Sequence, residues 1–383
     1  MKSEWKRTKL KDLVEFNPRE SLAKGTLAKK VTMSDLVEKK RKIRNFHITE
    51  YKGGTLFRNG DILFARITPS LENGKIAQVD ILEDNEIGFG STEFIVWRAI
   101  AGVSDPGFVY YLANYGPIVE TAIRSMSGTS GRQRVQLDAL KDFACPVPPL
   151  RTQKAIADTL SCLDAKIDLN DRMNENLEKQ AQAIFKSWFV DFEPFQDSDF
   201  VESQYGWIPQ GWRLGRLGEF IEVTSGKRPI VKTNQRTPNN KVPVIGASRV
   251  MGYTNESLFD DRVLVIGRVG THGVVQRIDF PCWPSDNTLV IKSQFYEFAY
   301  QVLKRIDYSS INRGSTQPLI TQRDLRNQVI VVPPESVLRR YEDVASSLLE
   351  VVRNNLRENQ TLSSLRDTLL PKLMSGEIEV PVV

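Results

Sequence analysis

Two long segments that repeat at a fixed distance constrain the fold of this chain more than any other feature. From Leu150 to about Trp188 the sequence contains neither glycine nor proline, and one set of positions recurs in alternating steps of four and three. These positions are Ile156, Leu160, Leu163, Ile167, Asn170, Asn174, Leu177, Ala181, Ile184 and Trp188. Such spacing is typical of a coiled-coil seam, so it predicts one long helix from residue 150 to about residue 188.

A second copy of this pattern lies 185 positions further along. The segment "LKDFACPVPPL" (140–150) returns as "LRNQVIVVPPE" (325–335), and the seam that follows it also returns. Its positions are Tyr341, Ala345, Leu348, Val352, Asn355, Asn359, Leu362, Arg366, Leu369 and Leu373. We therefore predict a second helix from Glu335 to Leu370 or a few residues beyond, with Pro371 disturbing its last turn and Gly376 ending it.

The two helices are predicted to pair as an antiparallel coiled coil. A register that centres them on each other places Asn170 opposite Asn359 and Asn174 opposite Asn355. Buried asparagines reduce stability but penalise slipped registers, so they specify one alignment. Helices of about 36 to 39 residues would form a rod of roughly 54 to 58 Å. The alternative is two amphipathic helices that each pack on their own domain.

The segments before each helix also resemble each other. "ILFAR" (62–66) matches "LVIGR" (264–268), "GSTEFIV" (90–96) resembles "SDNTLVI" (285–291), and "SGTSGRQRVQLDALKD" (127–142) resembles "RGSTQPLITQRDLRN" (313–327). Short β-branched runs between turn residues predict mixed α/β domains with small sheets. The expected fold is α+β with an internal pseudo-two-fold repeat. Its parts are a globular domain (1–149), a long helix with the start of a linker (150–195), a second globular domain (196–334), and a C-terminal helix and tail (335–383).

The positive charge is concentrated in one stretch of each half. The net charge is +5, but Val223–Asn255 contains six cations and no acid, and Lys24–Arg44 contains eight cations against two acids. Two such stretches at similar depth favour binding to a polyanion, because lysine and arginine release counterions from phosphates. The alternative is a pair of solvated loops.

The residues of a catalytic centre are missing from the sequence. There is no phosphate-binding GxxxxGK[ST] loop, and "FNPRE" (16–20) lacks the Pro-aromatic pair that follows Asn in amino-methyltransferases. His47 and His272 have no cysteine or carboxylate at a ligand spacing. Glu175 and Glu178 are interpreted as the solvated face of the first helix. Catalysis by this chain is therefore not expected.

Cysteine usage and hydropathy indicate the compartment. Cys145, Cys162 and Cys282 lie far apart, so we interpret each as structural rather than as part of a disulfide framework or metal site. No run approaches the roughly 18 apolar residues of a membrane span, and "MKSEWKRTKLKD" at the N-terminus contains no stretch typical of a signal peptide. We expect a cytoplasmic protein without membrane contact.

Together these motifs resemble a known family, the DNA specificity (S) subunits of type I restriction-modification enzymes. The resemblance covers essentially the whole chain. It rests on "ILFARITPSLENGKIA" (62–77), "PVPPLRTQKAIADTLSCLDAKI" (146–167), "GWIPQGWRLGRLGEF" (206–220), "GSTQPLI" (314–320) and "LRDTLLPKLMSGEI" (365–378), in this order and within the repeat.

The resemblance implies a non-catalytic subunit with two target-recognition domains, each reading half of a bipartite, asymmetric site in double-stranded DNA. Paired helices would set the distance between the domains and dock two adenine methyltransferase (modification) subunits, which restriction/translocase subunits then join. No cofactor is expected on this chain; S-adenosylmethionine, ATP and Mg would belong to the partner subunits.

The candidate DNA-binding residues lie in matching loops of the two domains, where side chains can reach base edges or phosphates. In the first domain they are Arg66, Ser70, Asn73, Lys75, Ser127, Thr129, Ser130, Arg132 and Arg134. In the second they are Lys227, Arg228, Arg268, Thr271, His272, Arg313, Ser315, Thr316 and Gln317. Ordinary turn chemistry is the alternative for any one of them. "TPSLENGKIAQ" has no counterpart after "LVIGR", so we expect the two half-sites to differ.

Two other functions stay open at this point. A stand-alone DNA methyltransferase or nuclease would turn over DNA without partners. A coiled-coil interaction protein that does not read sequence would bind DNA in a fully salt-sensitive way that is indifferent to sequence.

Overall fold

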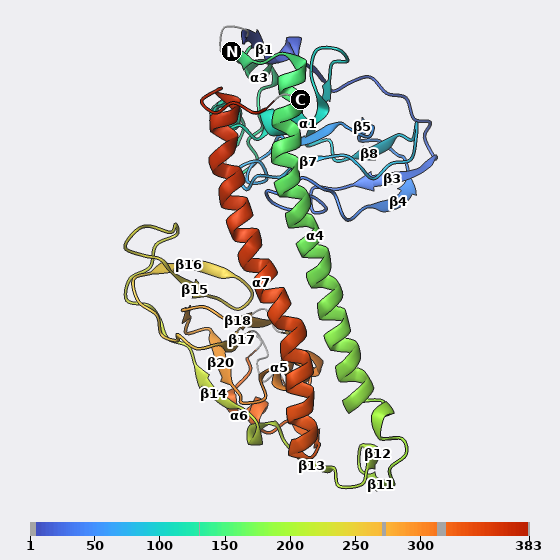
Figure 1. Cartoon of the computed structure of the whole chain (residues 1–383), viewed down its shortest axis with the longest axis vertical. Helices are drawn as coiled ribbons and strands as arrows, with labels where there is room; N and C mark the ends of the chain where they lie inside the picture. The colour runs from blue at the N-terminus through green and yellow to red at the C-terminus, as the bar shows by residue number, and fades with distance from the viewer. Residues whose placement is uncertain (1–4, 130, 270–272, 312–318, 382–383) are drawn as a thin grey trace. The chain divides into compact units, whose positions relative to one another are not determined.

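The computed structural model describes residues 5–129, 131–269, 273–311 and 319–381 (Figure 1). The chain forms two compact units. Unit 1 comprises Met1–Arg172 with Asn355–Val383, and unit 2 comprises Met173–Asn354. Among the described residues, no helix is long and apolar enough to cross a lipid bilayer.

Both predicted long helices are present. Helix α4 spans Leu150–Phe189 and helix α7 spans Glu335–Met374, each with 40 residues. Pro371 lies inside the last turn of α7, and the helix continues to Met374 before Gly376 adopts a left-handed φ of 68°. The glycine ends the helix because it tolerates this conformation without a Cβ clash.

The core of unit 1 lies between two four-stranded sheets and the helices. One sheet has the order β2-β9-β6-β7, formed by Val14–Phe16, Phe94–Ala99, Ile62–Ala65 and Ile76–Gln78. The other has the order β4-β3-β8-β5, formed by His47–Glu50, Leu27–Val31, Gly88–Gly90 and Thr55–Phe57. Strand β1 (Lys6–Lys9) pairs with β10 (Ala144–Val147), and η2 (Leu10–Asp12), α1 (Pro106–Ala113), α2 (Gly116–Arg124) and α3 (Leu137–Lys141) complete the unit.

Strand β6 shows why this part of the sequence is apolar at every position. Ile62 and Phe64 pack into the cluster that includes α1 and the start of α4, whereas Leu63 packs into the cluster of the second sheet. Successive side chains of a strand point to opposite faces, and here both faces are covered. The strand is therefore buried along its whole length.

Unit 2 repeats the strand order of the first sheet. Its four-stranded sheet has the order β14-β20-β17-β18, formed by Glu222–Ser225, Thr288–Lys292, Val263–Gly267 and Val275–Ile278. A three-stranded sheet has the order β16-β15-β19, formed by Val250–Thr254, Val242–Ile245 and Trp283–Pro284. The remaining elements are β11 (Phe200–Ser203), β12 (Gly206–Pro209), β13 (Arg213–Arg216), β21 (Val329–Val332), η3 (Glu193–Phe195), η4 (Leu217–Glu219), α5 (Tyr296–Arg305) and α6 (Gln322–Arg326).

The sequence repeat is thus also a repeat of topology. "ILFAR" and "LVIGR" contribute the equivalent strands β6 and β17, and β13 pairs with β21 as β1 pairs with β10. The prediction of two mixed α/β domains with small sheets is confirmed.

Within each unit, part of α4 contacts part of α7. In unit 1, Nδ2 of the buried Asn170 donates to Oδ1 of Asn359 at 2.9 Å and to Oε2 of Glu358 at 2.7 Å. In unit 2, Ala181 packs with Leu349 and Val352, while Leu348, the predicted seam residue beside Leu349, is only partly buried. Asn174 and Asn355 are also buried, each in a different unit, and their pairing stays a prediction.

One acid is buried where α7 packs against α5. The carboxylate of Glu342 accepts the N–H groups of Glu297 and Phe298 at 3.2 and 2.8 Å. Burial raises the pKa of Glu342 to about 7, although these two hydrogen bonds oppose the shift. The folded chain therefore holds a proton on Glu342 more tightly than the unfolded chain does.

The asparagine contact gives a first prediction. Asn170→Leu alone should destabilise unit 1 by about 1–3 kcal/mol, because it leaves the buried Oδ1 of Asn359 without a donor. Combining it with Asn359→Leu should recover most of the lost stability, since both amides are replaced by apolar groups while Asp171 keeps Lys40 as a partner. Urea unfolding of the single and double variants measures the effect. A single variant as stable as the double would contradict the role of this contact.

Glu342 gives a second prediction. Because its pKa is raised in the folded state, its stabilising contribution is complete below the unfolded value near 4.5 and is lost as pH rises through about 7. Glu342→Gln should flatten this dependence, by about 3 kcal/mol between pH 4 and pH 8. Unfolding titrations at the two pH values test this. Parallel pH profiles for the two proteins would show that Glu342 is not the titrating group.

Candidate nucleic-acid interface

The first candidate residue, Arg66, stands at the end of strand β6 and is held by its main chain. Its N–H donates to the carbonyl of Glu93 at 2.9 Å, and its carbonyl accepts the N–H of Val135 at 2.8 Å. The side chain is half-buried, and its Nε has no hydrogen-bond acceptor. A fixed backbone thus presents this guanidinium where the inner strand β6 ends.

The structure brings together the two loops that the sequence selected in unit 1. Thr68 donates its N–H to the carbonyl of Gln133 at 3.1 Å, and Ile67 forms an antiparallel bridge with Arg134. Main-chain hydrogen bonds in both directions between Ser127 and Arg134 close the glycine-rich loop. The two loops therefore form one connected surface.

The candidate side chains of this surface differ in their surroundings. Asn73, Ser127, Thr129 and Arg132 are exposed, and Ser70 is half-buried. Lys75 instead donates its Nζ to the carbonyl of Met33 at 2.7 Å, which anchors the loop to the domain. Ser130 lies outside the described residues. The assignment of these residues to DNA binding stays a prediction.

Arg134 is held by an acid that the sequence analysis did not select. Its guanidinium donates from Nη2 to Oε1 of Glu93 at 2.6 Å and from Nε to Oε2 at 2.9 Å. These hydrogen bonds lower the pKa of Glu93 from its ordinary value, so the pair stays charged at neutral pH. The pairing occupies Nε and Nη2 of Arg134, so a contact with DNA would use Nη1 or compete with Glu93.

Arg268 occupies the equivalent place in unit 2. Its N–H donates to the carbonyl of Asn287 at 2.9 Å, its carbonyl accepts the N–H of Ile320 at 3.0 Å, and its Nε also lacks an acceptor. Val269 forms an antiparallel bridge with Leu319, as Ile67 does with Arg134. The candidates Thr271, His272, Arg313, Ser315, Thr316 and Gln317 lie outside the described residues.

The strand register corrects one sequence match by a single residue. Ala65 pairs with Phe94 as Gly267 pairs with Thr288, so Glu93 is equivalent to Asn287 rather than to the threonine. The bridges make Leu319 the counterpart of Arg134. The Arg134–Glu93 ion pair therefore has no counterpart in unit 2, and the two loop surfaces differ chemically.

The basic stretch of unit 2 is exposed, as expected for a polyanion-binding segment. All six cations of Val223–Asn255 are exposed. Lys227 is fixed through its main chain, since its carbonyl accepts the indole N–H of Trp283 at 2.7 Å, while Arg228 lies 3.6 Å from Asp286. This surface can attract phosphates.

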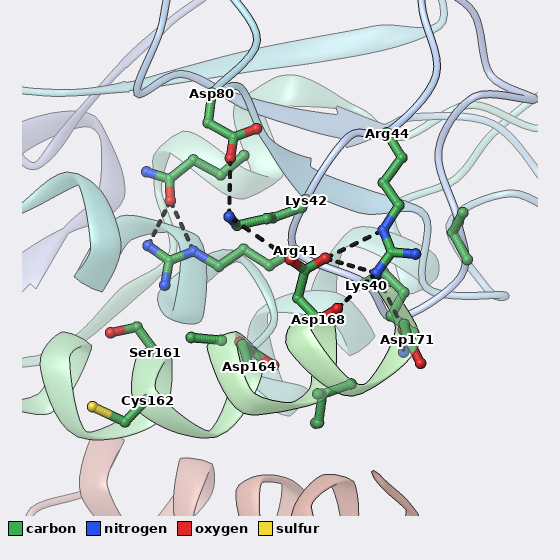
Figure 2. A pocket seen from close by; sticks show the side chains of 14 residues that line it. Lys40, Arg41, Lys42, Arg44, Asp80, Ser161, Cys162, Asp164, Asp168 and Asp171 are labelled. Carbon is green, nitrogen blue, oxygen red and sulfur yellow. Dashed lines mark hydrogen bonds and ion pairs between the residues drawn. The ribbon is translucent and has the colours of Figure 1, made fainter. Parts of the chain in front are cut away.

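The basic stretch of unit 1 is different, because several cations of its second half are paired with acids of the same unit. Lys40 pairs with Asp171 at 2.7 Å, and Arg44 pairs with Asp168 at 2.7 Å. Both acids belong to α4, and Lys42 lies within ion-pair distance of Asp168 as well. These cations line a pocket of about 400 Å³ against the helix rather than an open surface (Figure 2).

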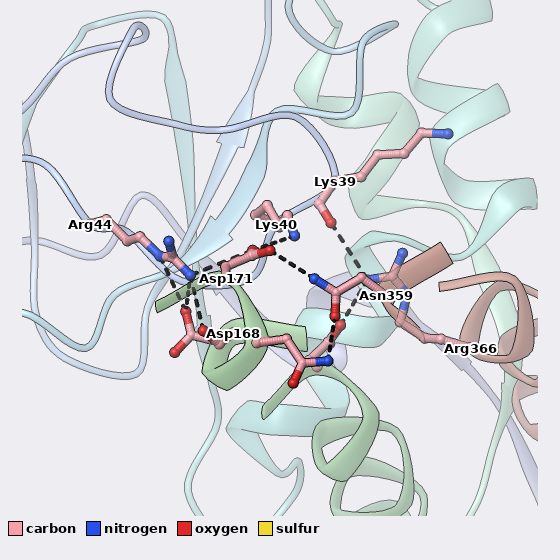
Figure 3. A network of polar contacts seen from close by, with 9 residues as sticks. Lys39, Lys40, Arg44, Asp168, Asp171, Asn359 and Arg366 are labelled. Atoms are coloured by element: carbon pink, nitrogen blue, oxygen red, sulfur yellow. Dashed lines mark hydrogen bonds and ion pairs between the residues drawn. The ribbon is translucent and has the colours of Figure 1, made fainter. Parts of the chain in front are cut away.

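A polar network extends from this pocket to α7 (Figure 3). Asn359 donates its Nδ2 to Asp171 at 2.8 Å, and Arg366 donates to the buried Asp164 at 2.7 Å. Burial opposes the charge of Arg366, but Asp164 outweighs it, so the pKa of the guanidinium is raised. The sequence carried part of the signal for this network. Asp164, Asp168 and Asp171 recur in steps of four and three, so they lie on one side of the helix and could pair with the cations of "KKRKIR" (39–44).

Two further interpretations are corrected or refined. Glu178 does not belong to the solvated face of α4, because it accepts a hydrogen bond from Arg277. Cys145 and Cys282 are buried, which raises the pKa of each thiol to about 11 and 12, while Cys162 is exposed on α4. Among the described residues, no group of histidine, cysteine and acidic side chains could hold a metal ion.

Comparison with known proteins identifies the family. The profile described as "Type I restriction modification DNA specificity domain" matches residues 2–179 and 209–343. The chain belongs to this family. It is 30% identical over 305 residues to the type I restriction enzyme MjaIX specificity subunit of Methanocaldococcus jannaschii, covering 71% of this chain and 69% of the relative. It is 25% identical over 410 residues to the HindI specificity subunit of Haemophilus influenzae, covering 84% of this chain and 87% of the relative.

The fold of this specificity subunit is similar to that of a solved relative. A crystal structure of a type I restriction-modification system S subunit from M. genitalium matches with a TM-score of 0.60 at 17% identity, covering 97% of this chain and 96% of that one. The likeness concerns the fold alone. The resemblance inferred from the motifs is confirmed, and it implies recognition of a DNA target.

The loop geometry of unit 1 gives a third prediction. Arg132→Ala should weaken binding to the DNA target, because an exposed cation is removed. The slope of the logarithm of the binding constant against the logarithm of the salt concentration should become shallower by about one, since about one counterion fewer is released. The melting temperature of this variant should stay unchanged. Arg134→Ala should lower the melting temperature, because it leaves Glu93 without its partner. Arg124→Ala, an exposed arginine on α2, is the matched control, and equal DNA binding by the Arg132 and Arg124 variants would reject the Arg132 assignment.

Proposed function

We propose that this specificity subunit reads a bipartite, asymmetric sequence in double-stranded DNA, one half with each globular domain. The observation that supports this most directly is the equivalence of Arg66 and Arg268. Each follows the same strand of the same sheet order and is held by the same two main-chain contacts. The chemistry around them differs at Glu93 and Asn287, which favours two different half-sites.

The long helices act in this proposal as an antiparallel coiled coil that spaces the domains around a pseudo-two-fold axis. The Asn170–Asn359 contact in unit 1 and the Ala181–Leu349 packing in unit 2 both agree with that pairing. A fixed spacer is required because half-sites that are out of phase on the double helix cannot be engaged together.

The same helices would dock two adenine methyltransferase subunits and, through them, the restriction/translocase subunits in the cytoplasm. Exposed apolar side chains on the helices, among them Leu169 and Leu356, are available for such docking. In this proposal the chain itself is not catalytic. S-adenosylmethionine, ATP and Mg are bound by the partner subunits.

The fourth prediction concerns co-expression with a type I methyltransferase subunit, which tests this function. We expect two methyltransferase chains per specificity subunit by native mass measurement, and methylated adenines at a two-part motif in DNA sequenced from the expressing cells. The isolated chain should neither cleave DNA with Mg nor methylate it with S-adenosylmethionine. Turnover by the isolated chain, or methylation at an uninterrupted motif, would overturn the proposal.

A further inference from the structure

Each globular domain has a strand that is followed by an aspartate at an equivalent position, Asp80 after β7 and Asp279 after β18. Ile62 pairs with Gln78 on β7 as Leu264 pairs with Arg277 on β18. Two residues further along stand Asp80 and Asp279, which are therefore equivalent. The two units thus present the same acid toward the long helices.

The helix positions that face these aspartates carry opposite charges. Asp168 on α4 and Arg353 on α7 are separated by the repeat distance of 185 residues, so they are equivalent, and each directly follows a seam residue. An acid stands there in unit 1 and a cation in unit 2. The same acidic strand end must therefore be accommodated in two different ways.

In unit 1 a lysine from the basic stretch separates the two acids. Nζ of Lys42 lies 3.7 Å from Asp80 and 3.9 Å from Asp168. Figure 2 shows the lysine between the two acids. Arg44 adds a hydrogen-bonded pair with Asp168 at 2.7 Å. Asp168 is mostly buried, and Lys42 is within ion-pair distance of both acids. We call Asp80, Lys42, Arg44 and Asp168 the first clamp.

In unit 2 no added cation is needed, because the helix supplies it. Arg353 lies 3.9 Å from Asp279 and 3.6 Å from the fully buried Glu297. Arg277, 3.1 Å from Glu297, also pairs with Glu178 of α4. We call Asp279, Glu297, Arg277 and Arg353 the second clamp.

The aromatic packing beside each clamp follows the same logic. In unit 1 the guanidinium of Arg41 binds Gln78 at 2.7 Å and lies 5.3 Å from the ring centre of Tyr110 on α1. In unit 2 the guanidinium of Arg277 itself lies 3.5 Å from the ring centre of Tyr300 on α5. A cation stacks on the following helix in both units, but only in unit 1 does it come from the basic stretch.

We propose that the two clamps match each recognition domain to its own helix, so that the domains cannot exchange places. The first domain on the second helix would set Lys42 and Arg44 against Arg353. The second domain on the first helix would set Asp279 against Asp168 without an intervening cation. Both arrangements bring like charges together in partly buried positions, which is destabilising. The stretch "KKRKIR" is therefore a docking element of the first domain.

In the complete protein this matching fixes which half-site lies at which end, and it holds each domain at a set angle to its helices. This consequence rests on the proposed function. If a clamp opens, its domain keeps its DNA-reading loops but loses its position. The readout that isolates the clamp is therefore the spacing between half-sites, while the half-site sequences report on recognition itself.

The fifth prediction concerns a set of charge-changing variants of the full-length chain. Asp168→Arg should open the first clamp, because the new cation faces Lys42 and Arg44. Lys42→Ala with Arg44→Ala should also open it, because Asp80 then faces Asp168. Combining all three changes should close it again, since Asp80 then pairs with a helix arginine as Asp279 does with Arg353. Opening should raise hydrogen exchange in residues 27–99 by about tenfold, which corresponds to 1.4 kcal/mol.

The same variants, co-expressed with the methyltransferase subunit, give the functional readout. Opened variants should methylate the original half-sites at additional spacer lengths, and the triple variant should return to one length. Asp158→Arg, an exposed acid on the same helix, is the matched control and should change neither readout. If hydrogen exchange in residues 27–99 of the triple variant is as fast as in Asp168→Arg, the proposed clamp is overturned. If the unmodified protein directs methylation to no two-part motif, that result would instead reject the proposed function.

Discussion

A buried charge or amide must find a partner, and this requirement governs how the long helices are used. In unit 1 one connected set of polar groups runs from the helix seam into the globular domain. Asn170 donates to Asn359, Asn359 donates to Asp171, and Asp171 accepts from Lys40 (Figure 3). A shift in the register would therefore also break the docking of the domain. The register of the two helices and the position of the globular domain are therefore coupled in this unit.

The candidate recognition loops depend on a different constraint, the main chain at the end of a buried strand. Because β6 and β17 are covered on both faces, Arg66 and Arg268 emerge from a rigid support. Their neighbours are free to differ, and Glu93 and Asn287 do. Such an arrangement permits new side-chain chemistry at the loop surface without altering the sheet that carries it.

The long helices and the topological repeat could be predicted from sequence because each rests on a periodic pattern. Seam spacing gave α4 to within one or two residues, and matching β-branched runs gave β6 and β17. Side-chain partners could not be predicted in the same way. The charges of "KKRKIR" and of Asp164, Asp168 and Asp171 were visible, but their contact depends on a fold that brings residues 40 and 168 together. DNA contact by Thr271, His272, Arg313, Ser315, Thr316 and Gln317, which lie outside the described residues, stays a prediction.

Cations of the same type therefore have two kinds of surroundings in this chain, and burial separates them. Arg132 and Lys227 are exposed, so salt screens them within about 8 Å at physiological ionic strength. Lys40 and Arg44 face mostly buried acids, where screening is weaker. Contacts to phosphates should weaken at salt concentrations that leave the domain docking intact. Net charge alone therefore does not give the number of unpaired cations, because the acids of α4 pair with part of the basic sequence.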